Sequence, residues 1–159
     1  MPLDTLQRFL DKKGVTYLRL QHSSAYTAQE IAAAAHVPGR ELAKTVMVKL
    51  DYRLIMAVLP ASHKIDFELL KRGTGAKHAA LATEADFKDI FPDCDTGAMP
   101  PFGNLYGVPV YVSSSLALDE DIAFNACSHT DLIKMPYADF ARIVRPIVLE
   151  FSRQEQLVM

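Results

Sequence analysis

Two short apolar runs at the centre of the chain constrain its fold most. Residues 44–50 and 53–59 are rich in β-branched and other apolar side chains, and only Asp51 and Tyr52 separate them. Two such runs joined by a two-residue turn predict a β-hairpin. We expect both strands to be central in their sheet.

Further helices and strands are predicted around this hairpin from apolar periodicity, capping residues and stop signals. Helices are expected at 3–13, from Thr27 to His36, at 66–72 with a stop at Gly73, from Thr83 to about Phe91, and from Pro136 to about Val144. Strands are expected at 15–20, 106–112, 122–127 and 130–135, and a loop stiffened by prolines at 92–109. A length of 159 residues fits one domain over 1–159, with a core at about 3–145 and a tail at 146–159.

Charge and cysteine content narrow the function classes. The chain carries 17 Lys and Arg against 19 Asp and Glu, a net charge of −2, which argues against an extended nucleic-acid footprint. The balance is uneven, because residues 40–82 hold eight basic and four acidic residues whereas residues 83–139 hold two and ten. This split indicates either a modest basic patch that meets a phosphate or a chance clustering of acidic helix starts and surface turns.

The expected cellular compartment follows from three further observations. Two cysteines, Cys94 and Cys127, are too few for a disulfide scaffold and too far apart for a zinc ribbon. The N-terminus is charged where a signal peptide would be apolar, and no run approaches the roughly 18 apolar residues of a membrane span. We therefore expect a soluble protein of the reducing cytoplasm.

Lys44 opens the first predicted strand of the hairpin. Side chains two apart on a strand share a face, so Lys44 is expected beside Val46 and Val48 at the mouth of an apolar face. A lysine there is either an edge residue whose stem covers the core or a fixed cation beside a pocket.

The loop from Gly97 to Gly103 concentrates backbone constraints. Proline pushes the preceding residue toward extended conformations, so Met99 and Pro100 are restricted by the two prolines that follow them. Glycine allows a positive φ or a close approach of backbone to a ligand. The pattern fits a rigid ledge of backbone groups that holds a carbonyl, a hydroxyl or a water, and it equally fits a rigid loop with no ligand.

The predicted strand from Phe124 to His129 is expected to place Asn125, Cys127 and His129 on one face. A cysteine beside a histidine can form a nucleophile, but side chains two apart on a strand rarely align as nucleophile and base. Pocket-lining packing is the favoured interpretation. Neither His22 nor His63 has a partner at metal-ligand spacing, so no metal site is expected.

These landmarks together resemble the YbaK/prolyl-tRNA synthetase-associated domain family over about residues 3–145. The ordered features are His22, the Thr27-capped helix, Lys44, Leu59-Pro60-Ala61, the Gly97-to-Pro101 loop and the Phe124-to-His129 strand. The resemblance implies an α+β fold with a mixed, barrel-like sheet surrounded by helices. It also implies a trans-editing hydrolase that deacylates mischarged aminoacyl-tRNA, chiefly tRNA(Pro) carrying alanine or cysteine.

The resemblance assigns roles to residues of this chain. Lys44, Gly97 and Pro101 are the expected catalytic positions. The expected substrate-binding positions are His22, Tyr26, Thr27, Met99, Phe102, Gly103, Asn125, Cys127 and His129. Similar proteins carry glycine where this chain has Cys127, so a thiol would narrow the pocket or change its polarity.

The implied mechanism needs no cofactor, no metal and no protein nucleophile. A water held by backbone groups and the 2′-hydroxyl of the substrate would suffice for an activated ester. The expected partner is the aminoacylated tRNA acceptor end, and a synthetase is a candidate second partner. No DNA and no membrane are expected, and the protein is expected to be a monomer or weak homodimer. The alternative is a non-catalytic module that binds aminoacyl-tRNA ends or ligands like aminoacyl-adenosine.

Overall fold

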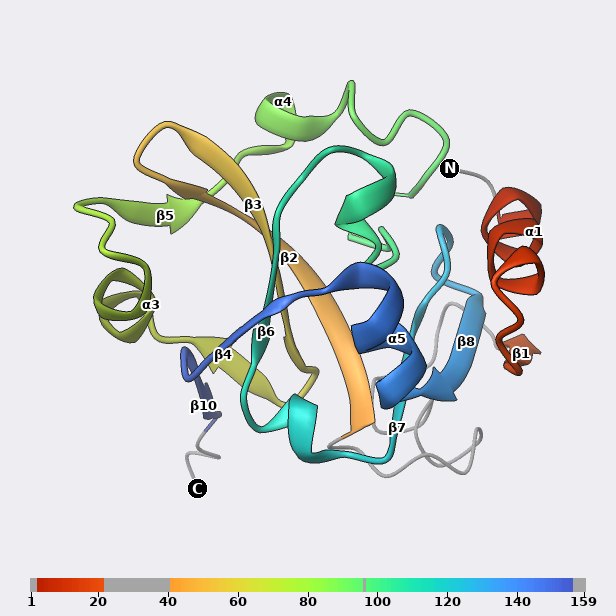
Figure 1. Ribbon diagram of the computed structural model, residues 1–159. Coiled ribbons are helices and arrows are strands. Elements are labelled where there is room, and N and C mark those ends of the chain that lie inside the picture. Colours follow the sequence, from red (N-terminus) through yellow and green to blue (C-terminus); the bar gives the residue numbers. More distant parts are fainter. Residues whose placement is uncertain (1–2, 22–40, 96, 156–159) are drawn as a thin grey trace.

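The predicted hairpin lies at the centre of the protein. A computed structural model describes residues 3–21, 41–95 and 97–155 (Figure 1). Strands β2 (Leu42–Leu50) and β3 (Arg53–Pro60) pair antiparallel, from Ala43 opposite Pro60 to Leu50 opposite Arg53. Asp51 makes the turn with a φ of 56°. The hairpin prediction is confirmed.

A mixed sheet extends outward from this hairpin. Its order is β1-β8-β7-β2-β3-β6-β9, and β5 pairs with β2 off this path. The other strands of this sheet are β1 (Leu18–Gln21), β5 (Ala79–Leu81), β6 (Val110–Ser113), β7 (Asp121–Asn125), β8 (Asp131–Pro136) and β9 (Ile147–Leu149). The β2–β7, β3–β6 and β6–β9 pairs are parallel and the rest antiparallel, so the expected mixed α+β architecture is confirmed. The path is open from β1 to β9.

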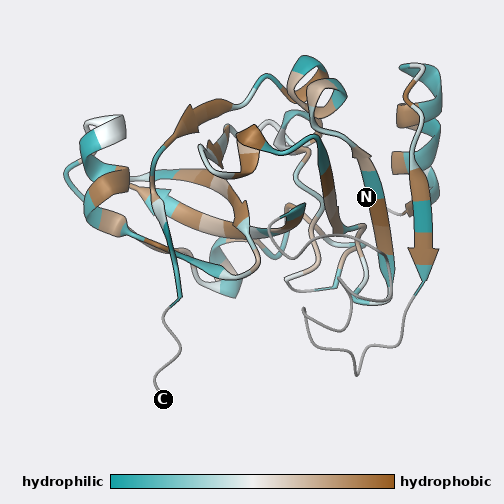
Figure 2. Ribbon diagram, turned by 90° about the horizontal axis from the view of Figure 1, so that it is seen from below, coloured by the Kyte–Doolittle hydropathy of each residue, from teal (hydrophilic) through white to brown (hydrophobic). Residues whose placement is uncertain are grey.

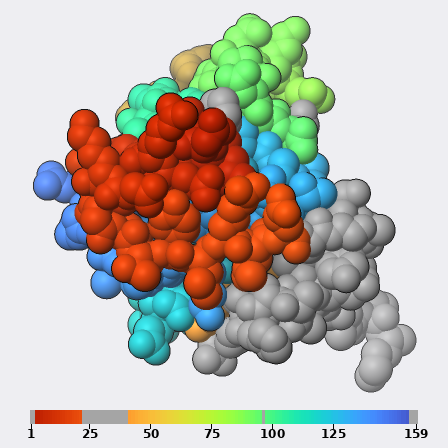
Figure 3. All heavy atoms as spheres, turned by 90° about the vertical axis from the view of Figure 1, so that its right-hand side faces the viewer, coloured from red at the N-terminus to blue at the C-terminus, as the bar shows by residue number. Residues whose placement is uncertain are grey.

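Each face of the sheet has its own core. One face packs against α1 (Leu3–Lys12) and α5 (Tyr137–Val144), with Phe102, Phe124 and Phe140 at its centre. In Figure 2 hydrophobic residues gather along the central strands, and in Figure 3 residues 3–21 cover one side of the molecule beside the β7–β8 hairpin. Within the described ranges, no helix is long and apolar enough to cross a membrane.

The opposite face of β2 and β3 is covered by α3 (Phe67–Thr74) and by a two-stranded sheet of β4 (His63–Ile65) and β10 (Ser152–Gln154). Phe151 is fully buried there. Residues 147–154 therefore pack against the rest of the described chain, because β9 joins β6 and β10 joins β4.

Two helices differ from the prediction at their ends. Asp66 caps α3 by accepting from the amides of Glu68 and Leu69, but α3 continues through Gly73 and ends at Gly75, which has a φ of 77°. Helix α4 (Glu84–Phe87) has the capping box of Thr83 and Asp86, yet it ends four residues before the expected Phe91. The chain then turns, which buries Phe91 against Tyr106 at a ring distance of 4.4 Å.

Strand β6 starts at Val110 rather than at residue 106, since the 3₁₀ helix η2 (Gly103–Leu105) and a turn at Gly107 precede it. A second 3₁₀ helix, η3 (Leu116–Leu118), follows it. The predicted helix from Thr27 to His36 lies outside the described residues.

Candidate functional site

Lys44 lies where the sequence predicts it, on the face of β2 that also carries Val46 and Val48. Its side chain is partly buried. Burial lowers the pKa of the Lys44 ammonium, and the Glu155 carboxylate acts in the opposite direction. The lysine is therefore a cation at the boundary between the apolar face and solvent.

The edge of β2 next to Lys44 lies between two strand pairings. Strand β7 pairs with β2 only at Leu42 and Ala43, and β5 pairs with it only from Val48 to Leu50. Because β3 occupies the other edge, β5 and β7 share this one, and residues 44–46 lie between them. A sheet edge interrupted beside a lysine can admit a ligand that the paired parts of the edge exclude.

Asn125 ends β7 beside this interruption. Leu42 and Ala123 are register partners, so the alternation of side chains puts Lys44 and Asn125 on the same face of neighbouring strands. The Asn125 Oδ1 atom is buried and has no hydrogen-bond partner among the described residues. A buried acceptor without a partner costs free energy unless a ligand or water supplies the donor.

Backbone conformation and burial constrain the Gly97-to-Gly103 loop. Gly97 has a φ of 85°, in the region that favours glycine. A Cβ on Gly103 would lie 2.4 Å from the Val108 carbonyl oxygen, so only glycine fits there. Ala98, Met99 and Phe102 are buried and anchor the loop in the core.

The same loop is attached to the end of β7. The Cys127 amide donates to the Ala98 carbonyl at 2.8 Å, and the Asp95 amide donates to the Cys127 carbonyl at 2.9 Å. His129 Cε1 lies 3.6 Å from where a Cβ on Gly97 would stand. The structure therefore brings together Gly97, Cys127 and His129, three of the residues predicted for the site.

Two predictions about Cys127 are wrong. First, Cys127 is not a free thiol, because it forms a disulfide with Cys94. A disulfide sulfur has no proton to lose and cannot serve as the thiolate nucleophile. Cysteine count and spacing gave no sign of this bond, since the chain folds residues 33 positions apart to within 4.4 Å between Cα atoms.

Second, Asn125, Cys127 and His129 do not share a strand face. Strand β7 ends at Asn125, and Cys127 has a φ of 76°, which breaks the pleat. A tight turn follows, in which the Ala126 amide donates to the Asp131 carbonyl at 2.9 Å. The turn leaves His129 exposed, beside Gly97 and not in line with Asn125.

Other predicted site residues have different surroundings. The side chains of Met99 and Phe102 belong to the core. Pro101 is buried beside them. His22, Tyr26 and Thr27 lie outside the described residues.

Sequence reasoning missed a polar cluster on the Lys44 face. His63 Nδ1 lies 2.8 Å from Ser152 Oγ, and Ser152 Oγ lies 2.6 Å from the Oγ of buried Ser113. Burial, and then the charge of Lys44, lower the pKa of the His63 imidazole. His63 follows the Leu59-Pro60-Ala61 element, which could have drawn attention to it, whereas Ser152 is 89 residues away and gave no local signal.

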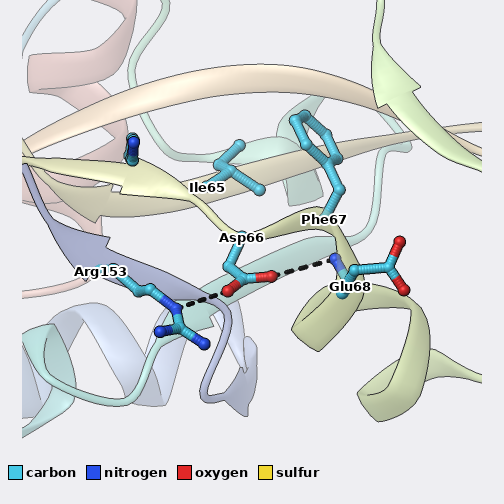
Figure 4. Close-up of a pocket in the computed structure, with 6 residues that line it drawn as sticks. Ile65, Asp66, Phe67, Glu68 and Arg153 are labelled. Atoms are coloured by element: carbon cyan, nitrogen blue, oxygen red, sulfur yellow. Dashed lines mark hydrogen bonds and ion pairs between the residues drawn. The ribbon is translucent and has the colours of Figure 1, made fainter.

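A surface pocket of about 440 Å³ lies beyond this cluster, at the start of α3 (Figure 4). Asp66 stands in its wall, paired with the Arg153 guanidinium and accepting from the Glu68 amide. These contacts serve the cap of α3, and none of the residues predicted for the site lines this pocket.

Comparisons with known proteins identify the family of the chain. A family model of the aminoacyl-tRNA editing domain matches residues 22–143. The multifunctional Ser/Thr-tRNA deacylase ProXp-y of Escherichia coli K12 is 24% identical over 150 residues, covering 91% of this chain and 89% of the relative. A proline–tRNA ligase of Macrococcus caseolyticus is 26% identical over 100 residues, covering 63% of this chain and 17% of the ligase.

The fold has solved counterparts. A crystal structure described as a candidate trans-editing enzyme for prolyl tRNA synthetase superposes with a TM-score of 0.81 and 16% identity, covering 95% of this chain and 96% of that one. At this identity the likeness shows the fold alone. The family match, in contrast, spans most of the chain, which therefore belongs to the aminoacyl-tRNA editing domain family of deacylases.

Proposed function

We propose that this protein is a trans-editing enzyme that hydrolyses the ester of mischarged aminoacyl-tRNA carrying a small amino acid. The observation that carries the proposal is that Lys44 and Asn125 share a face where β2 parts from β7, while the Gly97 loop is hydrogen-bonded to Cys127 just beyond β7. Alanine or cysteine on tRNA(Pro) is the first expected substrate. The tRNA acceptor end is the expected partner.

A second substrate class has its own support. The E. coli relative is named a Ser/Thr-tRNA deacylase, and the buried Asn125 Oδ1 offers an acceptor to a substrate hydroxyl or ammonium group. A site built around such an acceptor penalises substrates that leave it unpaired. Serine or threonine is therefore the second candidate for the aminoacyl group.

The chemistry asks little of the protein, because an aminoacyl ester is already activated. Lys44 would hold the charged 3′ end by its ammonium group, turning an encounter into a reactive geometry. The backbone of the Gly97-to-Pro101 loop would position a water and stabilise the developing charge on the carbonyl oxygen. The terminal 2′-hydroxyl of the tRNA would take part as a group of the substrate.

Charge distribution is consistent with a small footprint. The basic stretch at 40–82 includes Lys44, whereas residues 83–139 are strongly acidic, so phosphate contacts would be confined to one end of the tRNA. A cytoplasmic location, delivery of the tRNA by a synthetase and a monomer or weak homodimer complete the proposal.

A single-turnover assay with tRNAs charged with alanine, cysteine, serine and threonine tests this function. Release of at least one amino acid, faster than its uncatalysed hydrolysis, is the expected result. Saturable binding without hydrolysis for every tRNA would instead support a non-catalytic module. Alanine and cysteine released in preference to serine and threonine would favour the first substrate class, and the reverse would favour the second.

A further inference from the structure

The Cys94–Cys127 disulfide joins the two segments that form the candidate site. Cys94 lies on the loop that leads to Gly97, and Cys127 lies just beyond β7. The two hydrogen bonds between Cys127 and residues 95 and 98 flank the disulfide. The covalent bond therefore sits at the junction of loop and strand, not at a remote surface.

Cys127 has a backbone conformation that cysteine disfavours. A φ of 76° is common for glycine but costs free energy for a residue with a Cβ. The disulfide and the two flanking hydrogen bonds hold it there. His129, two residues later, lies beside Gly97, so relaxation of Cys127 would turn His129 away from the loop.

We propose that Cys94 and Cys127 are a redox modification site that controls the editing site. The disulfide form holds the loop and the turn in the competent arrangement, and the dithiol form lets the turn relax. This inference rests on the proposed function for its effect on activity. In the reducing cytoplasm proposed above, disulfides are mostly transient and act as catalysts or sensors.

The reductant is a dithiol. One of its thiolates attacks a sulfur of the Cys94–Cys127 bond, which breaks and gives a mixed disulfide, and the second thiolate then displaces the protein sulfur. The two electrons pass to Cys94 and Cys127, which take up two protons to become thiols. The dithiol leaves as its own disulfide.

Reduction is expected to act locally. Ala98, Met99 and Phe102 are buried in the core, and this packing should hold the loop in place after the disulfide is reduced. The β7–β8 pairing, from Asp121 opposite Pro136 to Asn125 opposite Leu132, does not depend on it either. The dithiol form should therefore stay folded and differ only around the turn at 126–131.

The first test compares the full chain in its air-oxidised form and after dithiothreitol. Mass spectrometry after thiol alkylation should find no free thiol before reduction and two after it. Hydrogen exchange should quicken at 94–103 and 126–131 on reduction and stay unchanged in β3. Deacylation should fall on the order of ten-fold. A disulfide that never forms, or equal activity in both verified states, would overturn the proposal.

Two variants separate the bond from the backbone strain. Cys94→Ala removes the bond and keeps a Cβ at residue 127, so the turn should relax as in the dithiol form, and activity should match that of the reduced protein with or without dithiothreitol. Cys127→Gly removes the bond and also suits the positive φ, so it should exceed Cys94→Ala and lose sensitivity to the reductant. Sensitivity that persists in Cys127→Gly would contradict the mechanism.

These readouts distinguish two kinds of failure. If no mischarged tRNA is hydrolysed in either redox state, the proposed function fails, while alkylation and hydrogen exchange still report whether the Cys94–Cys127 disulfide forms and holds the loop and the turn. If hydrolysis occurs at the same rate in both redox states, the proposal of redox control fails and the proposed function stands.

Discussion

The two halves of strand β2 differ in how they are held. From Met47 to Leu50 the strand is bonded on both edges, to β3 on one side and to β5 and Ala82 on the other. From Lys44 to Val46 the second edge lies between the pairings of β7 and β5. The half from Met47 to Leu50 serves the stability of the sheet, and the half from Lys44 to Val46 carries the lysine of the candidate site.

This difference shows how one strand can serve both stability and chemistry. The doubly bonded half packs Val48 and Leu50 into the core with Ile55, and a ligand has no access to it. In the other half, residues 44–46 lie between the pairings of β7 and β5, and just beyond β7 the Cys127 amide donates to the Ala98 carbonyl of the Gly97 loop. Substitutions in the two halves should therefore affect different properties.

The largest effect is expected from Lys44→Ala. Loss of the ammonium group should lower deacylation about 100-fold or more, because one charged or hydrogen-bonding group at the reacting centre contributes that much. The melting temperature should change little. Lys49→Ala on the same strand is the matched control, since Lys49 instead pairs with Asp86 at 2.9 Å. Comparable losses in both variants would contradict the assignment.

Stability should respond most to the doubly bonded half. Ile55 faces it and is 1% exposed, so Ile55→Ala should lower the free energy of unfolding by about 2–4 kcal/mol. Chemical denaturation measures this, with Leu118→Ala as control, because Leu118 is 87% exposed and should cost at most about 0.5 kcal/mol. Activity per folded molecule should persist in Ile55→Ala. A lower kcat without a lower free energy of unfolding would contradict the assignment of this half of β2 to stability alone.

Sequence reasoning predicted the elements whose signals are local. The β2–β3 hairpin followed from two adjacent apolar runs, and Lys44 was placed on its correct face by alternation alone. Strands β4 and β10 were missed, because each has three residues and pairs with a partner far along the chain. Short segments carry too little periodicity to be recognised.

The candidate site was predicted less completely for a related reason. A positive φ at Gly97 could be expected because the residue is glycine, whereas nothing in the sequence suggests the positive φ of Cys127. The alternation was therefore extended past Asn125, where the strand in fact ends. The disulfide was missed because it depends on the loop returning to β7, which no local pattern encodes.

A pair of glycines sharpens the comparison between site and scaffold. Gly97 and Gly14 have φ values of 85° and 71°, so alanine at either position should cost about 1–2 kcal/mol of stability. Only Gly97 lies beside His129, since nothing lies within 4 Å of a Cβ on Gly14. Gly97→Ala should lower deacylation about ten-fold, and Gly14→Ala should retain it. Equal activities in the two variants would show that the Gly97 loop is not part of the site.

The smallest expected effect is the pH dependence of stability that comes from Asp86, which pairs with Lys49 in the doubly bonded half of β2. The Thr83 amide, followed by Lys49 and the Thr83 hydroxyl, lowers the pKa of Asp86 to about 2. Since the folded-state pKa lies below the ordinary value of about 4, the carboxylate stabilises the fold above pH 4, and this stabilisation is lost as the pH falls toward 2.

An NMR titration of the Asp86 carboxyl group should therefore have its midpoint near pH 2. Lys49→Ala should raise that midpoint only part of the way to the ordinary value, because the Thr83 amide, the larger cause, remains. Asp86→Asn keeps an acceptor for that amide but cannot titrate, so its stability should lack this acid-dependent component. A wild-type midpoint near 4 would show that neither the Thr83 cap nor the Lys49 ion pair holds the Asp86 carboxylate. An unchanged midpoint in Lys49→Ala would show that Lys49 does not tie α4 to β2, and the contrast between the two halves of β2 would then rest on β5 alone.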